Sequence, residues 1–244
     1  MHERTVEIAT ADGRMPTFVT RPEGDERCPA VLFYMDAPGI REELKDMARR
    51  LATVGYYVVL PNLFYRDGGP SFDPALLPTQ GPDPEMVRLN LALSHAQVLA
   101  DTRTLLELLE HEPAASRGAM AAIGYCMGGR HALAAAGVFP HRVKAMASLH
   151  GGYQVTGRSD SAHLLIPRLK AECYFGFAAD DPLTPPEHQR LIGEALAQHG
   201  IPHQIEVHPG TRHGFTFPQR YCYHKAAAER VWERLFALLR RRLG

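Results

Sequence analysis

One short stretch, from Ala121 to Arg130 (AAIGYCMGGR), constrains the fold more than any other part of the sequence. Its pattern predicts a strand that brings Cys126 into a sharp turn, after which a helix begins. Gly124 and Gly128 flank Cys126, which is the G-x-S-x-G spacing of a nucleophile elbow with sulfur in place of oxygen. Small residues are needed there because the incoming strand and the outgoing helix approach closely around a strained backbone.

The expected helix N-terminus next to Cys126 also bears on the chemistry of its thiol. Unpaired backbone N–H groups and a partial positive charge at such a terminus lower a thiol pKa and can hold a developing oxyanion. The alternative is a structural cysteine buried at a strand-to-helix junction, because cysteine is often found inside proteins. Cys126 therefore needs partner residues before it is assigned as a nucleophile.

Composition and charge narrow the class of protein. The 244 residues, of which 45% are hydrophobic and 22% charged, are typical of a soluble globular chain, and we expect residues 1–244 to form a single α/β domain. Lys plus Arg equals Asp plus Glu at 27 each, which argues against a nucleic-acid partner or a membrane surface. No run approaches the roughly 18 apolar residues of a membrane span, and the amino terminus lacks a continuous apolar core, so a cytoplasmic monomer or weak homo-oligomer is expected.

The cysteines are too widely separated for a metal-binding pattern. None of the four forms a C-x-x-C pair, which argues against a zinc site or a disulfide scaffold. We expect four reduced thiols and neither a metal nor an organic cofactor. The four are Cys28, Cys126, Cys173 and Cys222.

Strand and helix patterns alternate along the chain. Strands are expected over residues 5–9, 17–20, 30–35, 56–60, 119–125, 143–149, 172–178 and 204–208. Helices are expected over residues 44–54, over 86–110 as one long helix, and over 127–138, 186–199 and 228–239. This alternation predicts a mostly parallel sheet with helices on both faces, an antiparallel edge from the first hairpin, and ligands at the carboxyl ends of the strands.

Two connections lack periodicity. Residues 62–84 are dense in Gly and Pro, and so long a loop predicts a lid or a segment that contacts substrate, with a plain surface loop as the alternative. Residues 150–167 form the second irregular connection.

Partners for Cys126 are expected on loops that follow later strands. In α/β-hydrolases the order along the chain is nucleophile, acid and histidine. The pair Asp180-Asp181 follows the strand over 172–178, and His213 follows the last strand in a glycine-flanked loop. His213 is therefore the candidate base, and one of the two aspartates would orient its ring. The other histidines are interpreted as structural or surface residues, with His150 the least secure because it ends a strand on the same sheet edge.

The motifs GYCMGG (124–129), DPLTP (181–185) and RHGF (212–215), together with GYYVVLPNL (55–63), resemble the dienelactone hydrolases. These are α/β-hydrolases with a Cys-Asp-His triad, and the resemblance extends over nearly the whole chain. It implies a triad of Cys126, Asp181 and His213. Asp181 is preferred over Asp180 because Pro185 falls four positions later, as in the family's turn.

The resemblance adds Asp36 at the end of the strand over 30–35. Family members carry a carboxylate there, commonly glutamate, that interacts with the cysteine and is implicated in taking its proton. Because aspartate is one methylene shorter, Asp36 either reaches the thiol after a small backbone adjustment or acts only electrostatically. The alternative is a cap for the helix that begins near Arg41. Ala37 and Met127 match the positions whose backbone N–H groups form the oxyanion hole.

The expected activity is hydrolysis of an enol-lactone or an activated carboxylic ester through an acyl-cysteine intermediate. The basic residues that follow the histidine in the family's dienelactone-cleaving members are replaced here by Gly-Phe-Thr-Phe (214–217), which predicts a less acidic and more apolar substrate. A cation could instead come from four arginines, each of which is otherwise a surface residue: Arg66, Arg88, Arg158 and Arg212.

Two functions from other classes stay open. A redox-sensing thiol protein would need Cys173 or Cys222 as a resolving cysteine near Cys126. A binding protein on a degenerate hydrolase fold would not need the complete set of triad residues.

Overall fold

A computed structural model describes residues 1–77 and 80–244 in full, and residues 78 and 79 by their backbone. Eight strands form one mixed sheet in the order β1-β2-β4-β3-β5-β6-β7-β8. Strands β1 and β2 form an antiparallel hairpin that pairs antiparallel with β4, and the remaining neighbours are parallel. The strands are β1 (His2–Thr10), β2 (Gly13–Arg21), β3 (Ala30–Tyr34), β4 (Tyr57–Pro61), β5 (Met120–Tyr125), β6 (Val143–Leu149), β7 (Glu172–Asp180) and β8 (His203–Arg212).

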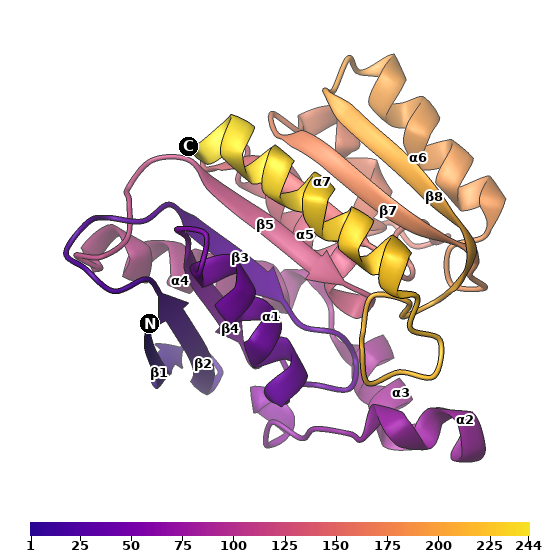
Figure 1. The fold of residues 1–244 in the computed structure, drawn as a ribbon, viewed down its shortest axis with the longest axis horizontal. Helices are drawn as coiled ribbons and strands as arrows, with labels where there is room; N and C mark the ends of the chain where they lie inside the picture. Colours follow the sequence, from indigo (N-terminus) through magenta and orange to yellow (C-terminus); the bar gives the residue numbers. More distant parts are fainter.

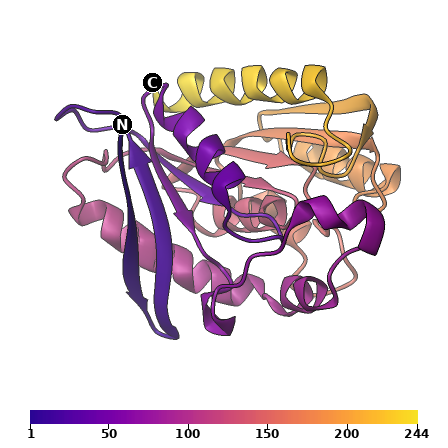
Figure 2. The ribbon, with the colours of Figure 1, turned by 60° about the horizontal axis from the view of Figure 1, so that its bottom comes forward.

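Helices cover both faces of this sheet, as Figures 1 and 2 show. Helices α1 (Glu42–Ala52) and α7 (Lys225–Leu243) pack on one face, and α4 (His95–His111), α5 (Met127–Val138) and α6 (Pro186–Gln198) lie on the other. Strands β3 and β4 are buried along their whole length, as their continuous apolar runs predict. The predicted α/β-hydrolase architecture with an antiparallel amino-terminal edge is confirmed.

The prediction of one long helix over residues 86–110 is wrong. Helix α3 (Pro84–Ala92) ends before Ser94, and α4 begins after it. Ser94 accepts a hydrogen bond from the backbone N–H of Gln97, and the Gln97 side chain accepts one from the backbone N–H of Ser94. This capping box starts a new helix although the apolar periodicity continues across it.

The irregular connections contain short helical turns. Residues 62–84 hold the 3-10 turns η1 (Tyr65–Asp67) and η2 (Pro74–Leu76) and the short helix α2 (Leu77–Gln80). The connection over 150–167 leads into the 3-10 helix η3 (Ala162–Arg168).

The last two strands are longer than predicted. Strand β8 extends to Arg212 and β7 to Asp180, because these two residues pair after an irregularity in the ladder. An ion pair of 3.3 Å between the Arg212 guanidinium and the Asp180 carboxylate accompanies this pairing. His213 therefore directly follows a strand, beside the end of the strand that leads to Asp181.

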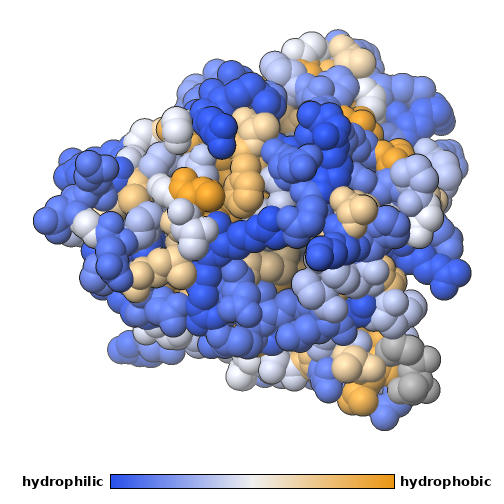
Figure 3. Space-filling view, viewed as in Figure 1, coloured by the Kyte–Doolittle hydropathy of each residue, from blue (hydrophilic) through white to orange (hydrophobic). Residues whose placement is uncertain are grey.

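The surface is predominantly hydrophilic on the face shown in Figure 3, where apolar residues form small separate patches. Among the residues that the structure describes, no helix is both long and apolar enough to cross a membrane.

Candidate active site

The turn at Cys126 has the backbone conformation of a strained elbow. Cys126 lies between β5 and α5 with φ 53° and ψ −117°, a region that residues other than glycine rarely adopt. A Cβ atom on Gly124 would collide with the carbonyl of Gly128, and one on Gly128 would collide with the carbonyl of Tyr34. The glycine spacing is therefore required by the close approach of strand and helix.

The end of β6 holds the elbow in place. The backbone N–H of Cys126 donates to the carbonyl of Leu149 (3.1 Å), and the N–H of Gly152 donates to the carbonyl of Cys126 (3.1 Å). The side chain of Cys126 is buried by this arrangement, with the residue 7% exposed.

The partly buried His213 pairs with the buried Asp181, whereas Asp180 does not take part. The His213 Nδ1 and Asp181 Oδ2 atoms are 2.8 Å apart, and the Asp181 side chain is 1% exposed. The other carboxylate oxygen of Asp181 accepts the backbone N–H of Leu183 at 2.9 Å. Asp181 is thus fixed by its own loop and orients the imidazole, while Asp180 is exposed and pairs with Arg212.

Electrostatics couple the thiol to the imidazole. Burial would raise the pKa of Cys126, but His213 and, to a smaller extent, Arg220 outweigh burial and lower it. Burial would likewise lower the pKa of His213, but the negative charges of Cys126 and Asp181 raise it. No well-aligned hydrogen bond to a described residue engages the buried Nε2 of His213. The site therefore favours a thiolate beside an imidazolium, with Nε2 available for proton transfer.

Asp36 is held by two arginines instead of by the thiol. Its fully buried carboxylate accepts hydrogen bonds from Arg41 (2.7 and 3.1 Å) and Arg220 (2.5 Å). Within the described residues it makes no hydrogen bond to Cys126, and its charge acts weakly to raise the pKa of that thiol. Asp36 does not cap α1 either, since Arg41 occupies the N-cap position without a side-chain cap.

Arg41 and Arg220 were missed by sequence reasoning. Both guanidinium groups lie over the Phe217 ring, at 5.1 and 4.4 Å from its centroid. Glu43 completes the cluster, because it pairs with Arg41 (2.6 Å) and accepts the backbone N–H of Gln219 (2.9 Å). These residues meet only in the folded structure. Residues 41 and 220 are far apart in the sequence, and no sequence spacing links them.

The two predicted oxyanion-hole positions lie at the same edge of the sheet. Ala37 follows β3, Met127 follows β5, and these strands are parallel neighbours. No hydrogen bond between described residues uses the backbone N–H of either residue. Their role as oxyanion donors stays a prediction.

His150 has a structural environment next to His213. Its ring centroid is 5.1 Å from that of His213 in an edge-on arrangement, and its Nε2 is 2.7 Å from the Thr216 hydroxyl. Burial holds the pKa of His150 well below its usual value, so its ring stays neutral. His150 supports the His213 ring by packing.

The two candidate resolving cysteines are poor thiolates. Burial raises the pKa of both Cys173, which is 1% exposed, and Cys222. The Cys222 thiol donates to the His213 carbonyl at 3.1 Å. All four cysteines are free thiols, and among the described residues no cluster of His, Cys, Asp and Glu suits a metal ion.

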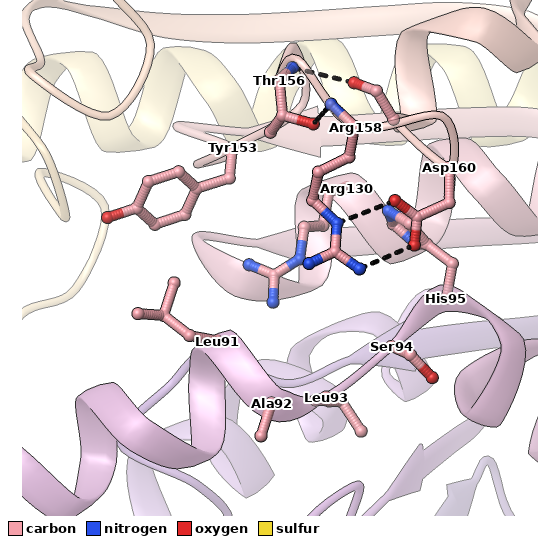
Figure 4. Close-up of a pocket in the computed structure, with 11 residues that line it drawn as sticks. Leu91, Ala92, Leu93, Ser94, His95, Arg130, Tyr153, Thr156, Arg158 and Asp160 are labelled. Atoms are coloured by element: carbon pink, nitrogen blue, oxygen red, sulfur yellow. Dashed lines mark hydrogen bonds and ion pairs between the residues drawn. The ribbon is translucent and has the colours of Figure 1, made fainter.

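Figure 4 shows the residues that line a cavity of about 320 Å³. Its walls come from the break between α3 and α4, from α5, and from the connection after β6. Residues that line it include Leu91, Leu93, His95, Arg130, Tyr153 and Arg158. Cys126, Asp181 and His213 are not among the residues that line it. Arg130 lies in the first turn of α5, and the negative charge of Cys126 acts on it to raise its pKa, which burial lowers.

The segment over residues 62–84 lines a different cavity from the one that contains Arg130. Residues 72–74, 76–77 and 80–84 line a smaller cavity of about 130 Å³ together with Pro38, which adjoins Ala37. A role of this segment in contacting substrate therefore stays a prediction.

The four arginines suggested by the sequence all have carboxylate partners. Arg66 pairs with Asp12 and Asp101, Arg88 with Asp67 and Glu85, Arg158 with Asp160, and Arg212 with Asp180. Phe215 and Phe217 are fully buried in the core, so the residues after His213 do not present an apolar surface to a ligand. The prediction of a less acidic and more apolar substrate, which rests on the missing basic residues, stays a prediction.

The eight-stranded sheet and the strained elbow define an α/β-hydrolase. The model of the "Dienelactone hydrolase family" matches residues 15–243, and the chain belongs to this family. It is 24% identical to a candidate carboxymethylenebutenolidase from Synechocystis sp., over 98% of this chain and 99% of that protein. A second candidate carboxymethylenebutenolidase, from Escherichia coli K12, is 29% identical to this chain, and the match covers 93% of this chain and 83% of the length of that protein. The crystal structure of a candidate dienelactone hydrolase from Klebsiella pneumoniae superposes with a TM-score of 0.87 at 24% identity, covering 98% of each chain.

Proposed function

We propose that this hydrolase cleaves an enol-lactone or an activated carboxylic ester through an acyl intermediate on Cys126. The observation that carries the proposal is the part-buried His213–Asp181 pair of 2.8 Å, whose imidazole is electrostatically coupled to a thiol at a nucleophile elbow. The names of the similar proteins support the substrate class, because carboxymethylenebutenolidases and lactonases act on lactones.

In the first half of the reaction the Cys126 thiolate attacks the carbonyl carbon of the substrate. The backbone N–H groups of Ala37 and Met127 donate to the carbonyl oxygen as it becomes an oxyanion. When the tetrahedral intermediate collapses, the C–O bond breaks and the enolate or alkoxide takes the proton from the His213 imidazolium. The acyl group is then a thioester of Cys126, and His213 is neutral.

In the second half, water attacks the thioester and gives up its proton to Nε2 of His213. The carboxylate of Asp181 stabilises the imidazolium that forms and holds Nδ1 in the required tautomer. Breakage of the C–S bond releases the carboxylic acid and restores the thiolate–imidazolium pair. A thiolate is suited to substrates with a good leaving group, so simple alkyl esters and amides are expected to react slowly.

We assign an electrostatic role to Asp36. Its carboxylate holds Arg220, whose positive charge helps to lower the pKa of Cys126. Both carboxylate oxygens of Asp36 accept hydrogen bonds from Arg41 or Arg220, and among the described residues neither is bonded to the thiol.

The proposal is tested with 4-nitrophenyl acetate and intact-protein mass spectrometry. Cys126→Ala should abolish both nitrophenolate release and the acyl adduct, and His213→Ala should stop turnover. Cys28→Ala is the matched control, since Cys28 is a free thiol outside the site, and it should retain activity. Full turnover by Cys126→Ala would contradict the proposal.

A further inference from the structure

The segment over residues 149–153, at the end of β6, holds two of the loops that carry the candidate triad. Its backbone is bonded to Cys126 through two hydrogen bonds of 3.1 Å, one to the N–H and one to the carbonyl of that residue. The backbone N–H of Tyr153 donates to the carbonyl of Leu183 at 3.2 Å. Because Leu183 belongs to the loop that Asp181 begins, the segment fixes the nucleophile relative to the acid.

His150 extends this segment to the loop that carries the third triad residue. Its fully buried ring lies edge-on to the ring of His213, with 5.1 Å between the two centroids. It also packs edge-on against Phe215 and Phe217, at 5.6 and 5.3 Å between centroids. The Nε2 atom of His150 is 2.7 Å from the hydroxyl oxygen of Thr216. One side chain thus contacts both His213 and residues that follow it in the chain.

The backbone of the segment is strained at this position. Among the described residues, three that are not glycine have a positive φ: Cys126 (53°), His150 (38°) and Tyr153 (54°). Two of the three belong to the segment, and the third is the candidate nucleophile that it holds. Such conformations persist only where the surrounding structure enforces them, and they are concentrated at active sites. The strain therefore favours a role for the His150 side chain in the site over a role in the fold alone.

The His150 ring can stay beside an imidazolium because it carries no charge. Burial holds the pKa of His150 well below its usual value, and the positive charges of His213, Arg220 and His208 act in the same direction. A neutral ring packs against the imidazolium of His213 without electrostatic repulsion, whereas a charged ring would oppose it. His150 is therefore suited to contact His213 in both protonation states that the proposed reaction requires.

The bond to Asp181 leaves the His213 ring a freedom of movement that His150 restricts. A ring held only through Nδ1 can rock about that bond and carry Nε2 away from the sulfur. His150 packs against the ring, and Gly152 of the same segment lies near it, since a Cβ atom there would be 3.8 Å from Cε1 of His213. A displacement of about 1 Å between reacting groups can cost on the order of a hundredfold in rate.

We propose that His150, fixed by the Thr216 hydroxyl, is a positioning residue that keeps Nε2 of His213 directed at the sulfur of Cys126 during acylation and deacylation. The inference rests on the proposed function, in which His213 carries the proton. His150 acts through His213 and does not itself exchange a proton. Its effect is on the rate of proton transfer, so kcat should respond to its loss while KM should change little.

The first test removes the hydrogen bond and keeps both rings. Thr216→Val should lower kcat for 4-nitrophenyl acetate about tenfold, because the His150 ring loses the contact that orients it. Thr216→Ser retains the hydroxyl and should keep most of the wild-type kcat. Thr17→Val is the matched control, since Thr17 is a fully buried residue of β2 whose hydroxyl donates to the Met15 carbonyl at 3.2 Å. This control should keep the wild-type kcat.

The second test removes the ring. His150→Asn introduces a side chain that tolerates a positive φ, and it should lower kcat on the order of ten- to a hundredfold. In both Thr216→Val and His150→Asn the pH midpoint for alkylation of Cys126 by iodoacetamide should move upward, because a displaced imidazolium stabilises the thiolate less. A loss of kcat in His150→Asn alone would support positioning by the ring and overturn the part assigned to the Thr216 hydroxyl.

Thermal melts separate positioning from a structural role. A merely structural contact would lower the melting temperature of both variants but leave kcat per folded molecule and the alkylation midpoint at their wild-type values. That result would overturn the positioning role and leave the proposed function intact. If the wild-type protein cleaves no ester, the alkylation midpoints decide: an upward shift in Thr216→Val supports the positioning of His213, and equal midpoints overturn it. If His150→Asn does not fold, the comparison of Thr216→Val with Thr216→Ser decides.

Discussion

Two groups of largely buried charged side chains act on Cys126, and they differ in how completely their charges are paired. His213 and Asp181 form a pair with one ring nitrogen left free toward the thiol. The second group consists of two carboxylates and two guanidinium groups that pair with one another, Asp36, Glu43, Arg41 and Arg220. The first group has a ring nitrogen that can exchange a proton. The charges of the second group are all paired within the group, so it is suited to stabilising the fold and to setting the electrostatic potential at the thiol.

This comparison predicts the largest effect on catalysis for the first group. Asp181→Asn should lower kcat on the order of a thousandfold or more, because the imidazole loses its tautomer and the stabilisation of its charge. Thermal stability should change little. The matched control is Asp180→Asn, which is exposed and forms only the pair with Arg212. Equal losses in the two variants would remove Asp181 from the mechanism.

For the second group the main effect should be on stability. Asp36→Asn leaves the buried Arg220 without its carboxylate partner and Arg41 with Glu43 alone, which should lower the free energy of unfolding by about 3–5 kcal/mol. Among folded molecules kcat should fall much less than in Asp181→Asn. Urea unfolding and active-site titration measure both quantities. A variant with wild-type stability and no activity would identify Asp36 as a proton acceptor and break the comparison.

The pH dependence of thiol alkylation measures how the charged groups act on the sulfur. Since the pKa of Cys126 lies below its usual value of 9.0, its reaction with iodoacetamide should be half-maximal below that pH. His213→Gln should move this midpoint upward, because burial then opposes the thiolate without the imidazolium. Peptide mass spectrometry provides an internal control in Cys222, whose pKa is raised by burial and which should react only at higher pH.

The smallest expected effect is at the edge of the second group. Glu43→Gln removes one charge from the pair with Arg41 and weakens the contact to the Gln219 N–H, which should cost about 1–3 kcal/mol of stability. The neighbouring Glu42 is exposed, so Glu42→Gln should change stability by less than about 0.5 kcal/mol. A fall in kcat/KM of Glu43→Gln without a fall in stability would show that this group takes part in the chemistry.

The helix break at Ser94 shows where sequence patterns stop being informative. Apolar periodicity runs through residues 86–110, but one capping box outweighs it and turns α4 away from α3. That break forms one wall of the cavity that holds Arg130. The sequence signal for the break was Ser94 three residues before Gln97, which is the spacing of a capping box. The apolar stripe over residues 86–110 was longer and looked continuous, so it favoured a single helix.

The sequence by itself determined the alternation of strands and helices, the elbow at Cys126, and the order in which Asp181 and His213 follow it. These features depend on local properties: glycine spacing, apolar runs, and the ends of strands that meet at one sheet edge. Only the tertiary structure decided that Asp36 is held by Arg41 and Arg220 and that Arg130, although buried, forms no ion pair with a described carboxylate. The reason is that ion pairing and burial depend on which side chains come into contact in the folded protein. Contacts between residues far apart in the chain produce no periodic pattern in the sequence.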